Sequence, residues 1–348
     1  MKVVHSDSYL LHNPMAEVEG SGQQSPYENP RRIQSIVAAL QADGGHEFVA
    51  PTEWGTDPIT AVHNPGLLKF LSEAWQLYTA QHPGVRDVVP DVFAMAALRT
   101  GMSPGREPEA IGGRVGYWCF ETTTPITETT YQAARGAVDI AMSATALVLG
   151  GERSSYGLCR PPGHHATRDL YGGYCFFNNA AVAAHHVAAT TGTKVTVLDV
   201  DYHHGNGTQQ IFYERDDVQY VSLHGDPVRA YPYTIGYADE TGAGKGLGCN
   251  LNYPLPLRAD DDLFVNTLQQ ACERIAAFGP SMVIVSLGLD TFITDPICDL
   301  AVTTDGFRRC GAAVAQLGLP TVVLQEGGFD VAALGANVAA WLGGLSGR

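Results

Sequence analysis

Four short runs rich in β-branched and other apolar residues recur in the second half of the chain, at 195–199, 219–223, 282–287 and 321–325. Apolar residues in these runs are nearly continuous rather than alternating, so each run predicts a strand buried on both faces. Alanine-rich stretches with helical character lie between or before them, at 130–149, 178–190, 261–278 and 304–317. This alternation predicts an α/β protein with an open parallel sheet flanked by helices.

The remaining pattern is less regular. Short strands are expected at 3–5 and 46–49, and a helix is expected at 30–40. Three segments rich in proline or glycine show little regular pattern: 14–30, 81–116 and 229–253. Long irregular loops inside a compact domain are typical of functional rims, lids or subunit contacts. No internal repeat or low-complexity linker divides the chain, so we expect residues 1–348 to form one domain.

The composition excludes several classes of protein. The 36 acidic and 21 basic residues give a formal net charge of −15 with histidine neutral, which repels nucleic-acid backbones and attracts cations. The seven cysteines are scattered without a C-x-x-C pair, so neither a disulfide framework nor a thiolate zinc cluster is indicated. The first residues turn polar too soon for a signal peptide, and no apolar run is long enough to span a membrane, so we expect neither a signal peptide nor a membrane span. We therefore expect a cytoplasmic protein without nucleic-acid or membrane partners.

Polar side chains follow the ends of the predicted strands. Asp199, Asp201 and His203 close or follow the first strand, His224 follows the second, and Asp290 follows the third. In open α/β sheets, ligands bind beyond the carboxyl ends of the strands. The sequence therefore predicts an active site at this edge of the sheet.

Two of these groups have the spacing of metal ligands. Asp201 and His203 are two residues apart, so their side chains project to the same side while the chain stays extended, and Asp199 shares that spacing. Asp290 would complete a site of oxygen and nitrogen donors with open positions for water and substrate. Zn²⁺ is the first expectation, although Fe²⁺, Co²⁺ or Mn²⁺ would also suit these donors. The alternative for each residue is that it caps a helix or binds solvent.

A pair of adjacent histidines, His164 and His165, follows a diproline turn and a glycine. Imidazoles titrate near neutral pH, so such a pair can serve as general base toward water and general acid toward a leaving group. Asp199 and Asn206 are candidate partners for the two rings, and a carboxylate makes its histidine more basic than an amide does. The alternative is a histidine pair that merely faces solvent.

These motifs resemble those of the histone deacetylase superfamily. The resemblance is carried by five segments in order: RPPGHH at 160–165, GGYC at 172–175, DVDYHHGNG at 199–207, SLGLD at 286–290 and EGG at 326–328. It implies the arginase-deacetylase fold, with the active site at the carboxyl ends of the strands. The N-terminal 19 residues, the insertion at 81–118 and the segment 222–227 are most similar to bacterial acetylpolyamine amidohydrolases.

The resemblance implies Zn²⁺ bound by Asp201, His203 and Asp290. His164 and His165 would be the catalytic pair, oriented by Asp199 and Asn206. In this superfamily the metal and the histidines activate a water that attacks the acetamide carbonyl, and the second histidine protonates the leaving amine.

Further expectations also follow from the resemblance. Structural K⁺ would bind at an inner site formed by Asp199, Asp201, His203, Ser222 and Leu223, and at a second site near Phe212, Arg215 and Val218. Tyr174 and Tyr231 would line the substrate tunnel, and Glu17 would receive a distant ammonium group. The insertion at 81–118 would narrow the tunnel entrance within a homodimer and so favour slender acetylated amines over folded protein.

The sequence departs from this pattern at Phe329, where the superfamily has a tyrosine that donates a hydrogen bond to the developing oxyanion. Loss of one such donor typically lowers the rate by about 10²- to 10³-fold, so we expect poor turnover, whether the phenylalanine is a natural variant or a deliberate substitution. Gly112 and Thr123 also stand at rim positions that are acidic in some polyamine-active relatives. Three functions stay open: hydrolysis of small acetylated amines, deacetylation of acetyl-lysine peptides, and catalytically silent binding.

Overall fold

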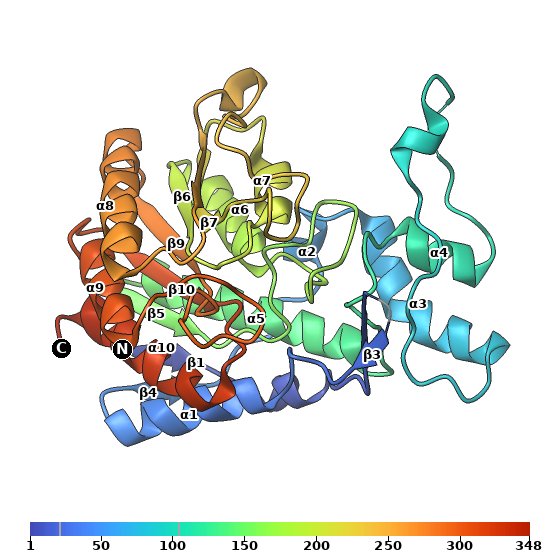
Figure 1. The fold of residues 1–348 in the computed structure, drawn as a ribbon, viewed down its shortest axis with the longest axis horizontal. Helices are drawn as coiled ribbons and strands as arrows, with labels where there is room; N and C mark the ends of the chain where they lie inside the picture. The colour runs from blue at the N-terminus through green and yellow to red at the C-terminus, as the bar shows by residue number, and fades with distance from the viewer. Residues whose placement is uncertain (21, 104) are drawn as a thin grey trace.

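The computed structural model describes residues 1–20, 22–103 and 105–348. Its centre is an eight-stranded sheet in which all neighbouring strands are parallel (Figure 1). Across the sheet the strands are β4 (Glu47–Val49), β1 (Lys2–Val4), β5 (Ser154–Gly157), β10 (Thr321–Gln325), β9 (Met282–Leu287), β6 (Val195–Asp199), β7 (Val218–Gly225) and β8 (Asn250–Leu255). The predicted open parallel sheet is confirmed.

Helices connect the strands and cover both faces of the sheet. The longer ones are α1 (Arg31–Asp43), α3 (Pro65–Gln81), α5 (Thr130–Leu149), α6 (Asn179–Thr191), α8 (Asp261–Phe278), α9 (Thr304–Ala315) and α10 (Val331–Ser346). The shorter ones are α2 (Asp57–Thr60), α4 (Ile111–Tyr117) and α7 (Asn206–Phe212). No helix in the described part of the chain is both long and apolar enough to cross a membrane.

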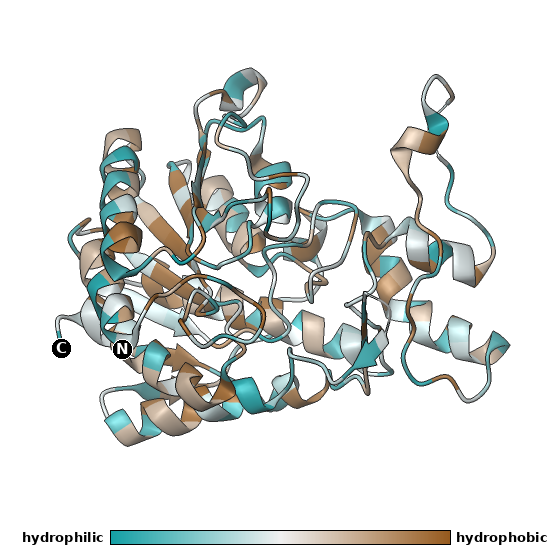
Figure 2. Ribbon diagram, viewed as in Figure 1, coloured by the Kyte–Doolittle hydropathy of each residue, from teal (hydrophilic) through white to brown (hydrophobic). Residues whose placement is uncertain are grey.

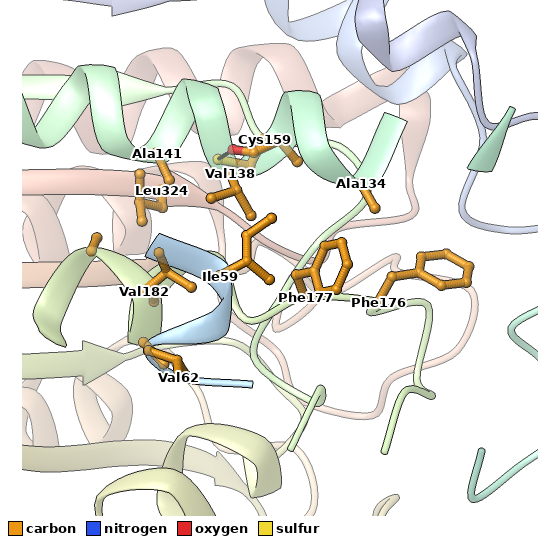
Figure 3. Close-up of a cluster of buried hydrophobic side chains, with 14 of the residues drawn as sticks. Ile59, Val62, Ala134, Val138, Ala141, Cys159, Phe176, Phe177, Val182 and Leu324 are labelled. Carbon is orange, nitrogen blue, oxygen red and sulfur yellow. Dashed lines mark hydrogen bonds between the residues drawn. The ribbon is translucent and has the colours of Figure 1, made fainter. Parts of the chain in front are cut away.

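Side chains of the strands belong to two separate hydrophobic clusters. Val195 and Val197 of β6 point into one cluster, while Leu198 points into the other, because successive side chains of a strand face opposite sides of the sheet. The first cluster includes residues of α5 and α6 and is drawn in Figure 3, and the second includes residues of α1, α8, α9 and α10. Hydrophobic colour accordingly concentrates on the strands and on the inward sides of helices such as α8 (Figure 2).

The segments expected to be irregular contain short regular elements. The segment 14–30 carries an antiparallel pair, β2 (Glu17–Glu19) and β3 (Gly22–Gln24). The segment 81–116 contains most of α4, and the segment 229–253 includes the start of β8. The prediction of loops was therefore wrong at these places, because β2 and β3 pair with each other and β8 pairs with β7, although their sequences are polar or short.

The insertion at 81–118, which includes α4, follows α3 and extends away from the sheet (Figure 1). Several large apolar side chains on it are exposed, with Leu98 at 73% and Val92 and Met102 at 66% each. Large exposed apolar side chains gathered on one segment are typical of surfaces that bind another molecule.

Candidate active site

Polar side chains from neighbouring strands meet around one cavity at the carboxyl edge of the sheet. The cavity has a volume of about 650 Å³. Its lining includes His164, His165, Asp201, His203, Asp290 and Phe329. The structure thus brings together the predicted histidine pair, the predicted metal ligands and residue 329.

The His203 ring lies between two buried carboxylates. Its Nδ1 is 3.3 Å from Asp201 Oδ1 and 3.0 Å from Asp290 Oδ2. The other carboxylate oxygens accept backbone N–H groups, Asp201 Oδ2 from Gly327 (2.8 Å) and Asp290 Oδ1 from Tyr202 (2.8 Å). These backbone bonds hold both carboxylates toward the imidazole.

This donor set fits a divalent cation. A Cβ at Gly327 would lie 2.5 Å from Asp290 Oδ2 and 2.6 Å from Asp201 Oδ2, so glycine permits the backbone to approach both carboxylates. Burial and the charge of Asp201 raise the pKa of Asp290 to about 7, because two carboxylates close together resist ionising at the same time. A bound cation relieves this repulsion, and two carboxylates with one imidazole suit a divalent transition metal.

Sequence reasoning missed Cys298 at this site. Its Sγ is 4.0 Å from His203 Nε2, and the ligand atoms of His203, Asp290 and Cys298 all lie within 4.8 Å of one another. Burial raises the pKa of the Cys298 thiol well above its usual value, so the group is a thiol rather than a thiolate. No spacing rule signals it, since it lies in an irregular segment after Asp290.

The adjacent histidines have different partners. His164 Nδ1 is 3.0 Å from Asp199 Oδ2, whereas His165 Nδ1 is 2.7 Å from Asn206 Oδ1. Burial lowers the pKa of His164, but the charges of Asp201 and Asp199 outweigh it and raise the pKa to about 10. The pKa of His165 falls well below its usual value because of burial and its histidine neighbours. The neighbouring carboxylates thus favour the protonated form of His164, whereas burial favours the neutral form of His165.

The chain matches a known protein family over most of its length. Residues 26–345 match the histone deacetylase domain. The chain belongs to the histone deacetylase family. It is 43% identical to acetylpolyamine amidohydrolase 1 of Pseudomonas aeruginosa over 348 residues, covering 100% of this chain and 99% of the relative. It is 41% identical to the acetylpolyamine amidohydrolase of Mycoplana ramosa over the full length of both chains.

Solved structures share the fold of this chain. The crystal structure of acetylpolyamine aminohydrolase from Burkholderia pseudomallei superimposes with a TM-score of 0.93 at 37% identity, covering 99% of this chain and 98% of that one. The HDA15 HD domain gives a TM-score of 0.80 at 28% identity, covering 99% and 89%. The arginase-deacetylase fold implied by the sequence motifs is confirmed.

Phe329 lines the cavity of this histone deacetylase family member. Its ring lies edge-on to Tyr174 (5.8 Å between centroids), and the Arg32 guanidinium carbon is 4.9 Å from its centroid. Its backbone N–H donates to Asp295 Oδ2 (2.7 Å), and Arg32 Nε donates to the Gly328 carbonyl (2.7 Å). Asp295 and Arg32 hold this loop from distant segments, and sequence reasoning missed both.

Of the residues expected to bind substrate, two line the cavity and one does not. Tyr174 and Tyr231 line the cavity, and the Tyr231 ring lies 5.0 Å from that of His165. Glu17 is not among the lining residues. It is buried, and its carboxylate accepts a hydrogen bond from Gln24 Nε2 (2.9 Å). Burial raises the pKa of Glu17 to about 7, which weakens its negative charge near neutral pH. Its role toward a distant ammonium group stays a prediction.

Glu121 lies in the cavity wall and binds the loop that carries Tyr174. Its Oε2 accepts hydrogen bonds from the N–H and, at 2.5 Å, the hydroxyl of Thr123. Its Oε1 accepts from the Thr124 hydroxyl and, at 3.0 Å, from the Gly173 N–H. The Thr124 hydroxyl in turn accepts the Tyr174 N–H (2.8 Å). Glu121 therefore ties two loops of the passage together.

The residues expected to bind monovalent cations fall in two places. Asp199 and Ser222 are register partners on β6 and β7, next to Leu223 and close to the Asp201 and His203 segment. Phe212, Arg215 and Val218 lie where α7 leads into β7, and the Arg215 N–H donates to the Phe212 carbonyl (2.9 Å). Both cation sites stay predictions.

Proposed function

We propose that this protein hydrolyses the acetamide bond of N-acetylated polyamines or similar small acetylated amines. The observation that carries the proposal is the convergence of Asp201, His203 and Asp290 with the His164–His165 pair in one cavity walled by aromatic rings. Relatives named acetylpolyamine amidohydrolase match the full length of the chain, which supports the substrate class.

Asp201, His203 and Asp290 would hold the metal ion, with Zn²⁺ first and Fe²⁺ or Co²⁺ as alternatives. When bound, the ion supplies Lewis-acid polarisation of a carbonyl oxygen and activation of a water. Asn206 Oδ1 can only accept a hydrogen bond, so His165 carries its proton on Nδ1 and leaves Nε2 as a base. His165 would take a proton from the attacking water there and return it to the leaving amine.

His164 would contribute positive charge rather than a base. Its Nδ1–H donates to Asp199, and the negative charges of Asp201 and Asp199 raise its pKa to about 10, which favours the protonated ring. A protonated imidazole beside the reacting carbonyl stabilises the negative charge that develops on oxygen.

Phe329 would limit turnover, because a phenyl ring cannot donate a hydrogen bond to the oxyanion. We expect the Phe329→Tyr variant to be about 10²- to 10³-fold faster than the protein with Phe329. The same residue favours a second candidate function, in which the protein binds acetylated amines without turning them over. An acetyl-lysine peptide deacetylase is the alternative if the entrance stays open.

The insertion would form a homodimer interface and narrow the entrance. Its exposed Val92, Leu98 and Met102 support this placement, and its Arg86, Arg99 and Arg106 would face a partner that is acidic overall. Structural K⁺ would bind at the two cation sites described above. Sedimentation across a range of concentrations tests the dimer, and a monomer throughout would contradict it.

The deciding experiment measures acetate release by zinc-loaded protein with Phe329 and by its Phe329→Tyr variant. The substrates are N-acetylputrescine, N-acetylcadaverine, acetylspermidines and an acetyl-lysine peptide. A large rate gain on the polyamines with tyrosine supports the proposal, and a gain on the peptide alone supports the peptide deacetylase. If neither form turns over while both bind acetylated amines, the silent binding function is correct.

A further inference from the structure

One wall of the cavity is fastened to the rest of the protein at Gly236. Residues 229–235 line the cavity, and Gly236 follows them directly. The Gly236 N–H donates to Glu240 Oε2 (2.8 Å), and its carbonyl accepts from His224 Nε2 (2.8 Å). Gly236 has a φ of +108°, and a Cβ there would lie 2.7 Å from the His204 ring. The backbone of the wall at Gly236 therefore packs closely against the His204 ring.

Glu240 connects this wall to a buried amide cluster. Its Oε2 also accepts from Gln209 Nε2 (2.6 Å), and Gln209 Oε1 accepts from His204 Nε2 (3.0 Å). Asn250 and Asn252 of β8 both donate to Gln209 Oε1 at 2.8 Å. Gln209, His204 and the two asparagines are buried. The Glu240 carboxylate therefore joins the cavity wall to the sheet, together with the His224 bond to Gly236 and the bonds from Asn250 and Asn252 to the Glu240 and Tyr237 carbonyls.

Several hydrogen-bond acceptors in this cluster have no donor. Among the described residues, His204 Nδ1 and the amide oxygens of Asn250 and Asn252 have no hydrogen-bond partner. Most bonds that hold the cluster converge on Gln209 and Glu240, and Asn252 adds one to the Tyr237 carbonyl (3.1 Å). Partly satisfied buried networks are sensitive to the loss of any one member.

We propose that Glu240 is a positioning residue that sets the width of the substrate passage through its bond to Gly236. The wall it holds includes Tyr231, whose ring lies 5.0 Å from that of His165. This inference rests on the proposed function, since the width is measured with acetylated substrates. The wall contacts the substrate chain rather than the reacting atoms, so loosening it weakens binding of a slender substrate while leaving the chemical step intact.

The test is Glu240→Ala in the zinc-loaded Phe329→Tyr protein, compared with Asp239→Ala. Asp239 is the exposed neighbour of Glu240, so its variant removes the same charge without touching the cluster. We expect Glu240→Ala to raise KM for a linear monoacetylated diamine about tenfold with kcat within about twofold, and to reduce its preference over an acetyl-lysine peptide. Glu240→Gln keeps an acceptor oxygen and should restore most of the loss. Asp239→Ala should match the parent protein.

Hydrogen exchange of residues 229–236, in the protein with Phe329, measures the wall without turnover. We expect the Gly236 amide to exchange about tenfold faster with Glu240→Ala than with Asp239→Ala. Faster exchange without hydrolysis by the Phe329→Tyr protein would defeat the proposed function and leave the bracing role intact. Exchange and KM equal to those of Asp239→Ala would overturn the inference. So would a joint loss of zinc and kcat, which would place the effect at the metal ligands.

Discussion

Replacing Glu28 by glutamine should destabilise the protein by several kcal/mol. Glu28 Oε1 accepts from Arg32 Nη1 (2.9 Å) and from Arg160 Nε (2.7 Å), and all three side chains are at most 2% exposed. Burial raises the pKa of Glu28, but the charges of Arg160 and Arg32 outweigh it and hold the pKa below its usual value. The carboxylate is therefore ionised, and it balances two buried guanidinium groups.

The size of the effect follows from this charge balance. Glutamine keeps the shape of Glu28 but leaves two buried cations without an anion, and breaking a buried ion pair in this way costs about 3–5 kcal/mol. An unfolding entropy of about 2.1 cal/mol/K per residue gives roughly 0.7 kcal/mol/K for a chain of 348 residues, so Tm should fall by about 4–7 °C.

Urea and thermal unfolding of the metal-loaded protein measure this loss. Glu214→Gln is the control, because Glu214 is exposed and its change should stay within about 0.5 kcal/mol. A loss below about 1 kcal/mol for Glu28→Gln would show that the two arginines do not depend on this carboxylate. Arg32 also donates to the Gly328 carbonyl, so the same variant should disturb the loop that carries Phe329.

Three further predictions address the metal, the substrate and the pH. Asp290→Ala should abolish zinc retention through gel filtration, and a normal zinc content by mass spectrometry would remove Asp290 from the ligands. Glu17→Ala in the Phe329→Tyr protein should raise KM more for acetylated polyamines than for uncharged acetamides, whereas equal effects would make Glu17 structural. Burial lowers the pKa of His63 to about 4, so between pH 6.5 and 4 the unfolded chain binds a proton that the folded protein excludes. Stability should therefore fall by roughly 3 kcal/mol across that window in urea titrations, and His63→Gln should flatten the fall. Identical pH profiles for the two proteins would contradict this assignment.

The strands that could be predicted from the sequence are those whose own side chains fill the core. β6, β9 and β10 are continuous apolar runs, and their bounds match the expectation closely. β5 reads Ser-Ser-Tyr-Gly and carries no such signal. It forms because β1 and β10 pair with it on both sides and because the Ser155 hydroxyl donates to the Ala144 carbonyl of α5. The local sequence pattern of β5 does not reveal these distant pairing partners.

The same distinction applies to the candidate site. The groups at strand ends could be gathered from the sequence, because parallel strands deliver their carboxyl ends to one edge. Arg32 could not, since its bond to Gly328 joins residues 296 positions apart. Asp295 and Cys298 were missed for a related reason. They lie on an irregular segment whose course is set by packing and not by a periodic pattern of hydrophobic residues.

The contacts of Glu121 separate attraction of a cation from its binding. Each of its carboxylate oxygens already accepts two hydrogen bonds from the protein, which fills the available lone pairs. A cationic substrate of the proposed kind would therefore meet negative charge that attracts it over a distance but offers it no direct ligand. Such a charge speeds encounter more than it prolongs residence, and added salt screens it. On the proposed function, charge at this part of the wall would govern how often amines arrive, while the shape of the passage would govern which of them stay bound.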